Sequence, residues 1–117
     1  MSNLATVNNE DDLKEYFDKK ELVVILVHDP NDSKSQEYFE SFEAITADRE
    51  EELFIQIDGT TNQDLVDFLS VKQFPTTIIY KGSKKKESYK GSDINKFLDI
   101  LKKQEEGVLS KLSKRLF

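Results

Sequence analysis

The sequence predicts an α/β domain with a mixed central sheet and helices on both of its faces. Three observations support this prediction. The run Leu22–Val27 is apolar at every position, which is typical of a strand covered on both faces. Segments with apolar residues at helical spacing alternate with β-branched runs, as in parallel strand–helix–strand units. Two strands separated only by the turn Lys81–Lys84 predict an antiparallel hairpin, so the expected order is β-α-β-α-β-α-β-β-α with a short C-terminal helical extension.

The first strand candidate is Leu4–Val7, and a helix follows it. Asn8 and Asn9 can cap this helix, and the acidic residues after them lie near its positive dipole end. We expect the helix to run to about Lys20. Its apolar face is formed by Leu13, Tyr16 and Phe17.

The apolar strand Leu22–Val27 is followed by the loop His28–Asp32 and a second helix. Ser33 with Gln36 can form a capping box that opens this helix, which should end near Ala47. Its apolar residues at helical spacing are Tyr38, Phe39, Phe42 and Ile45.

The next strand is Leu53–Ile57, which Asp58 and Gly59 end. Thr61 or Asn62 then caps a short third helix. The apolar residues of this helix are Leu65, Val66, Phe68 and Leu69.

Pro75 precedes the strand Thr76–Tyr80, where a missing N–H is tolerated at strand entry. A polar strand follows and ends near Lys90. Its lysine-rich beginning suits an exposed sheet edge, because lysine discourages pairing with other chains.

Gly91, Ser92 and Asp93 start the last helix, whose apolar face holds Ile94, Phe97, Leu98 and Leu101. We expect Gly107 to break the helical pattern. The chain therefore divides into a domain of residues 1–106 and a basic amphipathic extension of residues 107–117.

Composition limits the classes of function. The 117 residues suit one domain, and 37% hydrophobic with 34% charged residues is typical of a globular protein. The net charge of −6 disfavours nucleic acid as a partner, because such binding depends on neutralising phosphates. The absence of cysteine excludes disulfides, thiolate nucleophiles and Cys-ligated zinc. Without a signal peptide or a long apolar run, we expect a cytoplasmic protein that can reach the nucleus by diffusion.

The step Phe74-Pro75-Thr76 before a β-branched run resembles the cis-proline loop of thioredoxin-like proteins. The succession of elements over residues 4–104 looks like the complete thioredoxin fold, a three-layer α/β/α arrangement. Laying the family pattern over the chain without gaps places Asp32 and Ser35 where the two redox cysteines would stand. Leu26 falls near the place of the family's buried acid, and the usual tryptophan is absent. The resemblance therefore implies a redox-inactive member.

The resemblance also implies a binding surface that needs no cysteine. In the family, the backbone of the residue before cis-proline pairs with an extended substrate segment, a form of strand addition. By resemblance Phe74 holds that place, beside Pro75, Gly91 and the loop from Pro30 to Ser33. The alternative is that Phe74 simply packs and Pro75 only sets the strand entry. The second loop and helix also resemble the non-catalytic domains of protein disulfide isomerases, which bind polypeptide without redox chemistry.

A hydrolase site is a further alternative around His28, the only histidine. Asp29, Asp32, Ser33 and Ser35 lie near it in sequence and nominally supply an orienting acid and a nucleophile. No Gly-x-Ser-x-Gly elbow accompanies them, and neighbours on one loop seldom meet in triad geometry.

A calcium site in the same loop has little support. Asp29, Asn31 and Asp32 offer oxygen ligands, but Lys34 intrudes and the EF-hand spacing is missing. We expect neither a metal nor another cofactor.

The C-terminal extension, residues 107–117, carries +3, which leaves −9 on residues 1–106. So short a helix is marginal alone and needs a surface to dock on. Its own domain or a partner protein is favoured over an anionic membrane, because three charges and one short apolar face bind lipid weakly. The residues expected to dock are Leu109, Lys111, Leu112, Lys114, Arg115, Leu116 and Phe117.

The leading hypothesis is a redox-inactive, thioredoxin-like adaptor that is not an enzyme and acts by binding a protein or an extended peptide. The first alternative is a chaperone-like domain that binds polypeptide in the groove at Phe74 and Pro75. The second alternative is a weak hydrolase around His28.

Overall fold

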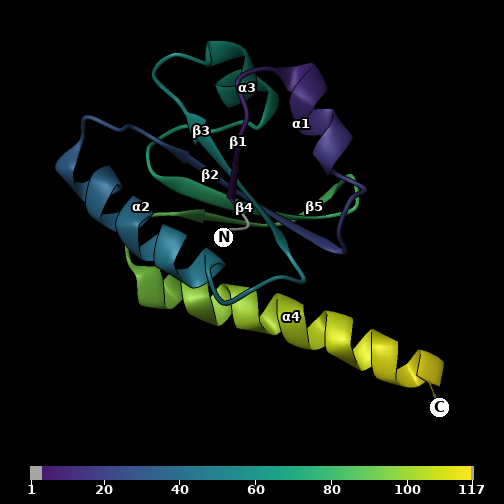
Figure 1. Ribbon diagram of the computed structural model, residues 1–117. Helices are drawn as coiled ribbons and strands as arrows, with labels where there is room; N and C mark the ends of the chain where they lie inside the picture. The colour runs from purple at the N-terminus through teal and green to yellow at the C-terminus, as the bar shows by residue number, and fades with distance from the viewer. Residues whose placement is uncertain (1–3, 117) are drawn as a thin grey trace.

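The computed structural model describes residues 4–116, with the side chains of residues 4–108, and shows nine elements in the predicted order. They are β1 (Leu4–Thr6), α1 (Glu10–Tyr16), β2 (Leu22–His28), α2 (Ser33–Thr46), β3 (Leu53–Asp58), α3 (Gln63–Phe68), β4 (Thr76–Lys81), β5 (Lys84–Lys90) and α4 (Ile94–Leu116). The predicted fold class is confirmed: α1 and α3 cover one face of a mixed sheet, and α2 and α4 cover the other (Figure 1).

The sheet has the strand order β1-β3-β2-β4-β5. β1 and β2 pair with β3 in parallel, whereas β4 runs antiparallel to both β2 and β5. The central strand is β2, in which all seven residues are buried. Val24 of β2, for example, lies between Phe54 of β3 and Ile79 of β4.

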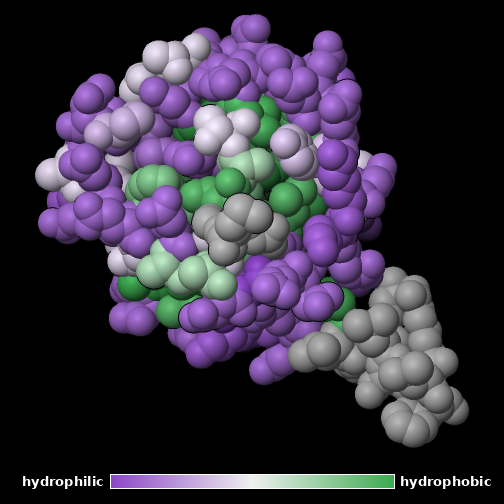
Figure 2. Space-filling view, viewed as in Figure 1, coloured by the Kyte–Doolittle hydropathy of each residue, from purple (hydrophilic) through white to green (hydrophobic). Residues whose placement is uncertain are grey.

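Two apolar cores form because successive side chains of β2 point to opposite faces. Val23, Ile25 and Val27 join the core under α1 and α3. The second core lies under α2 and α4 and contains a cluster of four buried aromatic rings. Its fully buried members include Leu26, Phe42, Phe54 and Phe97. Polar side chains cover most of the face seen in Figure 2, with apolar groups visible mainly between the two helical layers.

Side-chain caps start the first two helices. The Asn9 side chain accepts a hydrogen bond from the Asp12 N–H at 2.8 Å, as expected. At α2 the cap is Asp32, whose carboxylate accepts from the Ser35 N–H at 3.0 Å, and Ser33 is the first helical residue. The expected capping box of Ser33 is therefore replaced by an aspartate cap one residue earlier.

Helix ends differ most from the expected boundaries. α1 ends at Tyr16 rather than near Lys20. The predicted break at Gly107 is wrong, because α4 continues without interruption to Leu116. A single interior glycine costs a helix only about 1 kcal/mol relative to alanine, which strong helix formers around it can offset. The division between residues 1–106 and 107–117 stays a prediction. No described helix combines the length and apolar composition that a bilayer crossing requires.

We predict that Ser70→Gly stabilises the protein by about 0.5–1 kcal/mol, because a left-handed conformation is strained for residues with a Cβ. Ser70 follows α3 with φ +57°, where the Val71 N–H donates to the Val66 carbonyl at 2.9 Å. Urea unfolding followed by circular dichroism measures the change. Ser88→Gly, the same exchange within β5, is the control and should destabilise. Equal losses in both variants would show that Ser70 is not strained.

Candidate functional site

The residues expected to bind a partner gather at one edge of the sheet, here called the Pro75 edge and comprising Pro30, Ser33, Phe74, Pro75 and Gly91. The β2–β4 register pairs Val27 with Thr76, which places the end of β2 beside the segment that enters β4. The Gly91 N–H donates to the Pro75 carbonyl at 3.2 Å. Pro30 lies in the loop after β2, and Ser33 opens α2 at the same edge.

Phe74 has a packed side chain and an unpaired backbone. The Phe74–Pro75 peptide bond is cis, and Pro75 is buried. The half-buried Phe74 ring packs on the core under α1 and α3 and covers Gly59, where a Cβ would collide with it. Within the described residues, neither the N–H nor the C=O of Phe74 makes a hydrogen bond. The expected alternative, that Phe74 packs, thus holds for its ring, while its backbone N–H and C=O have no hydrogen-bond partner within the described residues.

The neighbouring backbone is held in place on both sides of Phe74 and Pro75. The Thr76 hydroxyl donates to the Gln73 carbonyl at 2.7 Å. The Gly91 contact fixes the Pro75 carbonyl. A backbone segment tied at both ends presents its free groups in one orientation, which lowers the entropy lost when a partner binds.

Asp32 and Ser35, which occupy the positions matched to the redox cysteines, make hydrogen bonds at the N-terminus of α2. Asp32 is exposed and serves as the helix cap, while Ser35 is fully buried. The Ser35 hydroxyl accepts a hydrogen bond from the Asp29 N–H at 3.4 Å, and the Asp29 carboxylate accepts from the Asn31 N–H at 2.9 Å. Neither a carboxylate cap nor a buried hydroxyl can perform the thiolate attack on a disulfide.

A buried hydroxyl pair lies beneath this edge. The Tyr38 hydroxyl of α2 lies 2.6 Å from Thr77 Oγ1 of β4. Burial raises the pKa of Tyr38, an effect that the hydrogen bond to Thr77 partly opposes. Thr77 lies opposite Leu26 in the sheet. The pair therefore ties α2 to β4 next to the apolar residue that stands near the family's buried acid.

Sequence reasoning did not identify this pair. The available signal was a tyrosine on the buried face of a helix and two threonines directly after Pro75. Buried polar groups are usually hydrogen-bonded, so a buried tyrosine and buried threonines in these elements indicate hydrogen bonds between side chains.

His28 is buried and separate from the expected nucleophiles. Its ring stacks on Phe39 with centroids 4.8 Å apart, and its Nε2 lies 3.4 Å from the Gln56 side-chain oxygen. Its Nδ1 has no hydrogen-bond partner within the described residues. Burial lowers the pKa of His28, while the Gln56 contact and the charges of nearby aspartates partly oppose this shift. The histidine contacts Phe39 and Gln56 and the Ser35 hydroxyl bonds to backbone, so these residues do not form the triad that the hydrolase alternative needs.

The structure bears differently on the possible metal ligands and on the docking residues of the extension. Among the described residues, no group of three or more histidine, aspartate and glutamate side chains is placed to hold a metal ion. The expected docking residues from Leu109 to Leu116 belong to α4. Their side chains, and all of Phe117, lie outside the part of the chain that the structure describes.

Comparisons with known proteins bear on the fold. No protein-family model and no curated protein sequence matches the chain. The solved thioredoxin of Fasciola hepatica has a TM-score of 0.81 and 19% identity, over 85% of this chain and 97% of that one. Malassezia sympodialis thioredoxin has a TM-score of 0.80 and 17% sequence identity, over 88% of this chain and 91% of that one. Schistosoma mansoni thioredoxin has a TM-score of 0.79 and 20% sequence identity, over 88% of this chain and 98% of that one. This chain therefore has the thioredoxin fold.

We predict that Gly59→Ala destabilises the protein by about 1–3 kcal/mol, because the new methyl group displaces the Phe74 ring. In a Phe74→Ala background the same substitution should cost less than about 1 kcal/mol, so a double-mutant cycle measured by urea unfolding reports the contact.

Gly107→Ala is the matched control for this cycle. A Cβ there meets no atom within 4 Å, and alanine is the better helix former, so this variant should be neutral or slightly stabilising. Additive effects of Gly59→Ala and Phe74→Ala would contradict the packing of the ring on Gly59.

Proposed function

We propose that this protein is a non-catalytic adaptor that binds a protein or an extended peptide along the Pro75 edge. The observation that carries the proposal is the pair of unpaired backbone groups on Phe74, held in a segment that is anchored on both sides. A chain with the thioredoxin fold and no cysteine keeps the shape of this edge without a thiol.

Strand addition is the mode of binding that suits this edge. An extended peptide would accept from the Phe74 N–H and donate to its carbonyl, in the same way that sheet strands pair. The ring of Phe74 contributes indirectly, because its packing over Gly59 keeps the backbone in position. Backbone pairing supplies affinity with little dependence on sequence, so the side chains of the partner would set specificity.

The charge of the domain and its extension adds to this proposal. Residues 1–106 carry −9, which favours a neutral or basic peptide over nucleic acid. The extension of residues 107–117 remains a second proposed docking segment, with docking residues from Leu109 to Phe117. A cytoplasmic location is part of the same proposal and stays a prediction.

We predict no catalysis of disulfide reduction. With dithiothreitol present, the rate of insulin reduction should be the same with and without the protein, because Asp32 and Ser35 supply no thiolate. A thioredoxin added at equal concentration is the positive control. An acceleration above the uncatalysed rate would refute a purely binding role.

For peptide binding, we predict that Phe74→Ala weakens the capture of reduced, carboxamidomethylated lysozyme, an unfolded basic polypeptide, by about tenfold, or about 1.4 kcal/mol. Fluorescence anisotropy of the labelled polypeptide measures the affinity. In the wild-type protein the Phe74 amide resonance should shift and become protected from hydrogen exchange on binding. This second measurement applies even where the variant folds poorly.

Two matched variants separate the Pro75 edge from other surfaces. Phe68→Ala removes the exposed aromatic ring of α3, which is 38% exposed, and should leave affinity unchanged. Joint replacement of Lys111, Lys114 and Arg115 by glutamate tests the extension. Loss of affinity only in this charge-reversed protein, with no shift at Phe74, would move the binding surface to the extension and overturn the proposal for the edge.

A further inference from the structure

The two halves of α4 are attached to the domain in different ways. The N-terminal half buries Phe97 and Leu101 completely in the core. Beyond Leu101 the described side chains of α4 are exposed or half-buried, although the helix continues to Leu116. Figure 1 shows this part of α4 extending past the sheet. Its attachment therefore depends on a small number of contacts.

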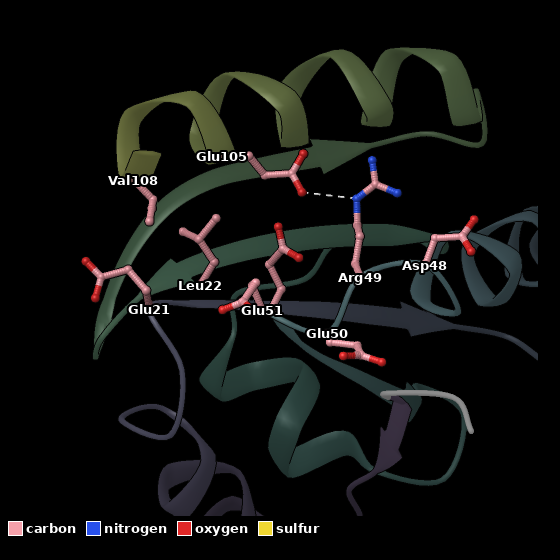
Figure 3. Close-up of a pocket in the computed structure, with 9 residues that line it drawn as sticks. Glu21, Leu22, Asp48, Arg49, Glu50, Glu51, Glu105 and Val108 are labelled. Carbon is pink, nitrogen blue, oxygen red and sulfur yellow. Dashed lines mark hydrogen bonds and ion pairs between the residues drawn. The ribbon is translucent and has the colours of Figure 1, made fainter. Parts of the chain in front are cut away.

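These contacts lie around a hollow of about 650 Å³ at the end of the sheet where β2 and β3 begin. Val108 packs at the margin of the core under α2 and α4. Glu105 Oε2 lies 3.0 Å from Arg49 Nε, and both side chains are about four-fifths buried, with 23% and 21% exposed. Figure 3 shows Arg49 reaching from the loop after α2 towards Glu105 on the helix.

Glu52 lies in the same hollow, directly before β3, and is only 6% exposed. Burial raises the pKa of Glu52 to about 8, with the hydrogen bond to Glu105 and the charge of Glu105 acting in the same direction and Arg49 opposing them. At neutral pH the Glu52 carboxyl is therefore protonated and can donate its hydrogen to the Glu105 carboxylate.

The charged surroundings of Glu52 are strongly acidic. Arg49 is the single cationic residue among those that line the described hollow. The acidic residues come from three parts of the fold: the segment before β2, the loop between α2 and β3, and α4. They are Glu21, Asp48, Glu50, Glu51 and Glu105. Among these residues, Glu105 is the one whose charge raises the pKa of Glu52, and the side chains of the other four are exposed.

We propose that the Glu52 carboxyl, placed under α4 beside the Arg49–Glu105 ion pair, is a proton-dependent latch for the helix beyond Leu101. With its proton, Glu52 binds Glu105 and holds this part of α4 on the domain. When the proton passes to water, the Glu52 and Glu105 carboxylates are both charged in a partly enclosed hollow that contains one arginine. Repulsion and the desolvation of the new charge then release the helix, together with the basic extension that it carries.

The sign of the pH dependence follows from the two pKa values. Glu52 has a higher pKa in the folded protein than its ordinary value of 4.5. Its contribution to stability is complete below pH 4.5 and is lost as the pH rises through about 8. One proton taken up on closing makes the opening constant rise by up to about tenfold per pH unit between the ordinary value of 4.5 and the closed-form value of about 8, and level off above it. This inference is independent of what binds at the Pro75 edge.

Amide hydrogen exchange of the full-length protein tests the latch, with rates corrected for intrinsic exchange. Between pH 7 and pH 9.5, protection of the amides of residues 102–108 should fall by about tenfold, whereas that of Phe97 and Leu101 should not change. In Glu52→Gln, the neutral amide should remove this dependence. Glu51→Gln is the matched control, because it removes a charge from the exposed neighbour in the same hollow and should behave as wild type.

A carbon-13 titration of the glutamate carboxyl groups gives a second readout on wild-type protein. Glu52 should titrate with a midpoint near 8, and Glu105→Gln should lower that midpoint by removing the facing charge. Titration of Glu52 near its ordinary value overturns the proposal. So does an equal loss of protection in Glu52→Gln, because the pH dependence would then arise elsewhere.

Discussion

The complete burial of β2 is the constraint on which the rest of the structure depends. A strand enclosed on both faces must pair its backbone on both sides, and β3 and β4 provide those hydrogen bonds. Its apolar side chains must also be covered on both faces, which requires the two helical layers. The ends of this one strand then set where the loops of the molecule meet. Both candidate sites lie at these ends.

At the end near Pro75, the chain keeps the thioredoxin fold but has no cysteine thiol. The Asp32 carboxylate and the Ser35 hydroxyl accept backbone hydrogen bonds at the start of α2, and the Tyr38 and Thr77 hydroxyls bond to each other. In the proposed function, a partner would bind the backbone of Phe74, whose ring packs over Gly59. Recognition through backbone groups needs a rigid presentation more than it needs particular side chains.

The opposite end of the sheet has a different character, because acidic groups crowd around a partly enclosed hollow. There a single arginine, Arg49, lies near the carboxyl groups of Glu52 and Glu105. Protonation of Glu52 relieves the repulsion between these two groups. The two ends are linked by α4, whose first turn follows Gly91 and whose later turns cross the hollow. In the proposed latch, release of α4 beyond Leu101 would leave the core contacts of Phe97 intact.

By itself, the sequence determined the order of elements, the central strand and the lack of thiol chemistry, because apolar periodicity and the absence of cysteine are local properties. It also predicted that Phe74 and Pro75 belong to a binding site, which stays a prediction. It misjudged Gly107, since the cost of one glycine depends on the helix around it. Only the tertiary structure decided that the Phe74 ring covers Gly59 and that Glu52 meets Glu105. Such pairs are distant in sequence, and their proximity and burial, which control both packing and pKa, exist only after the chain has folded.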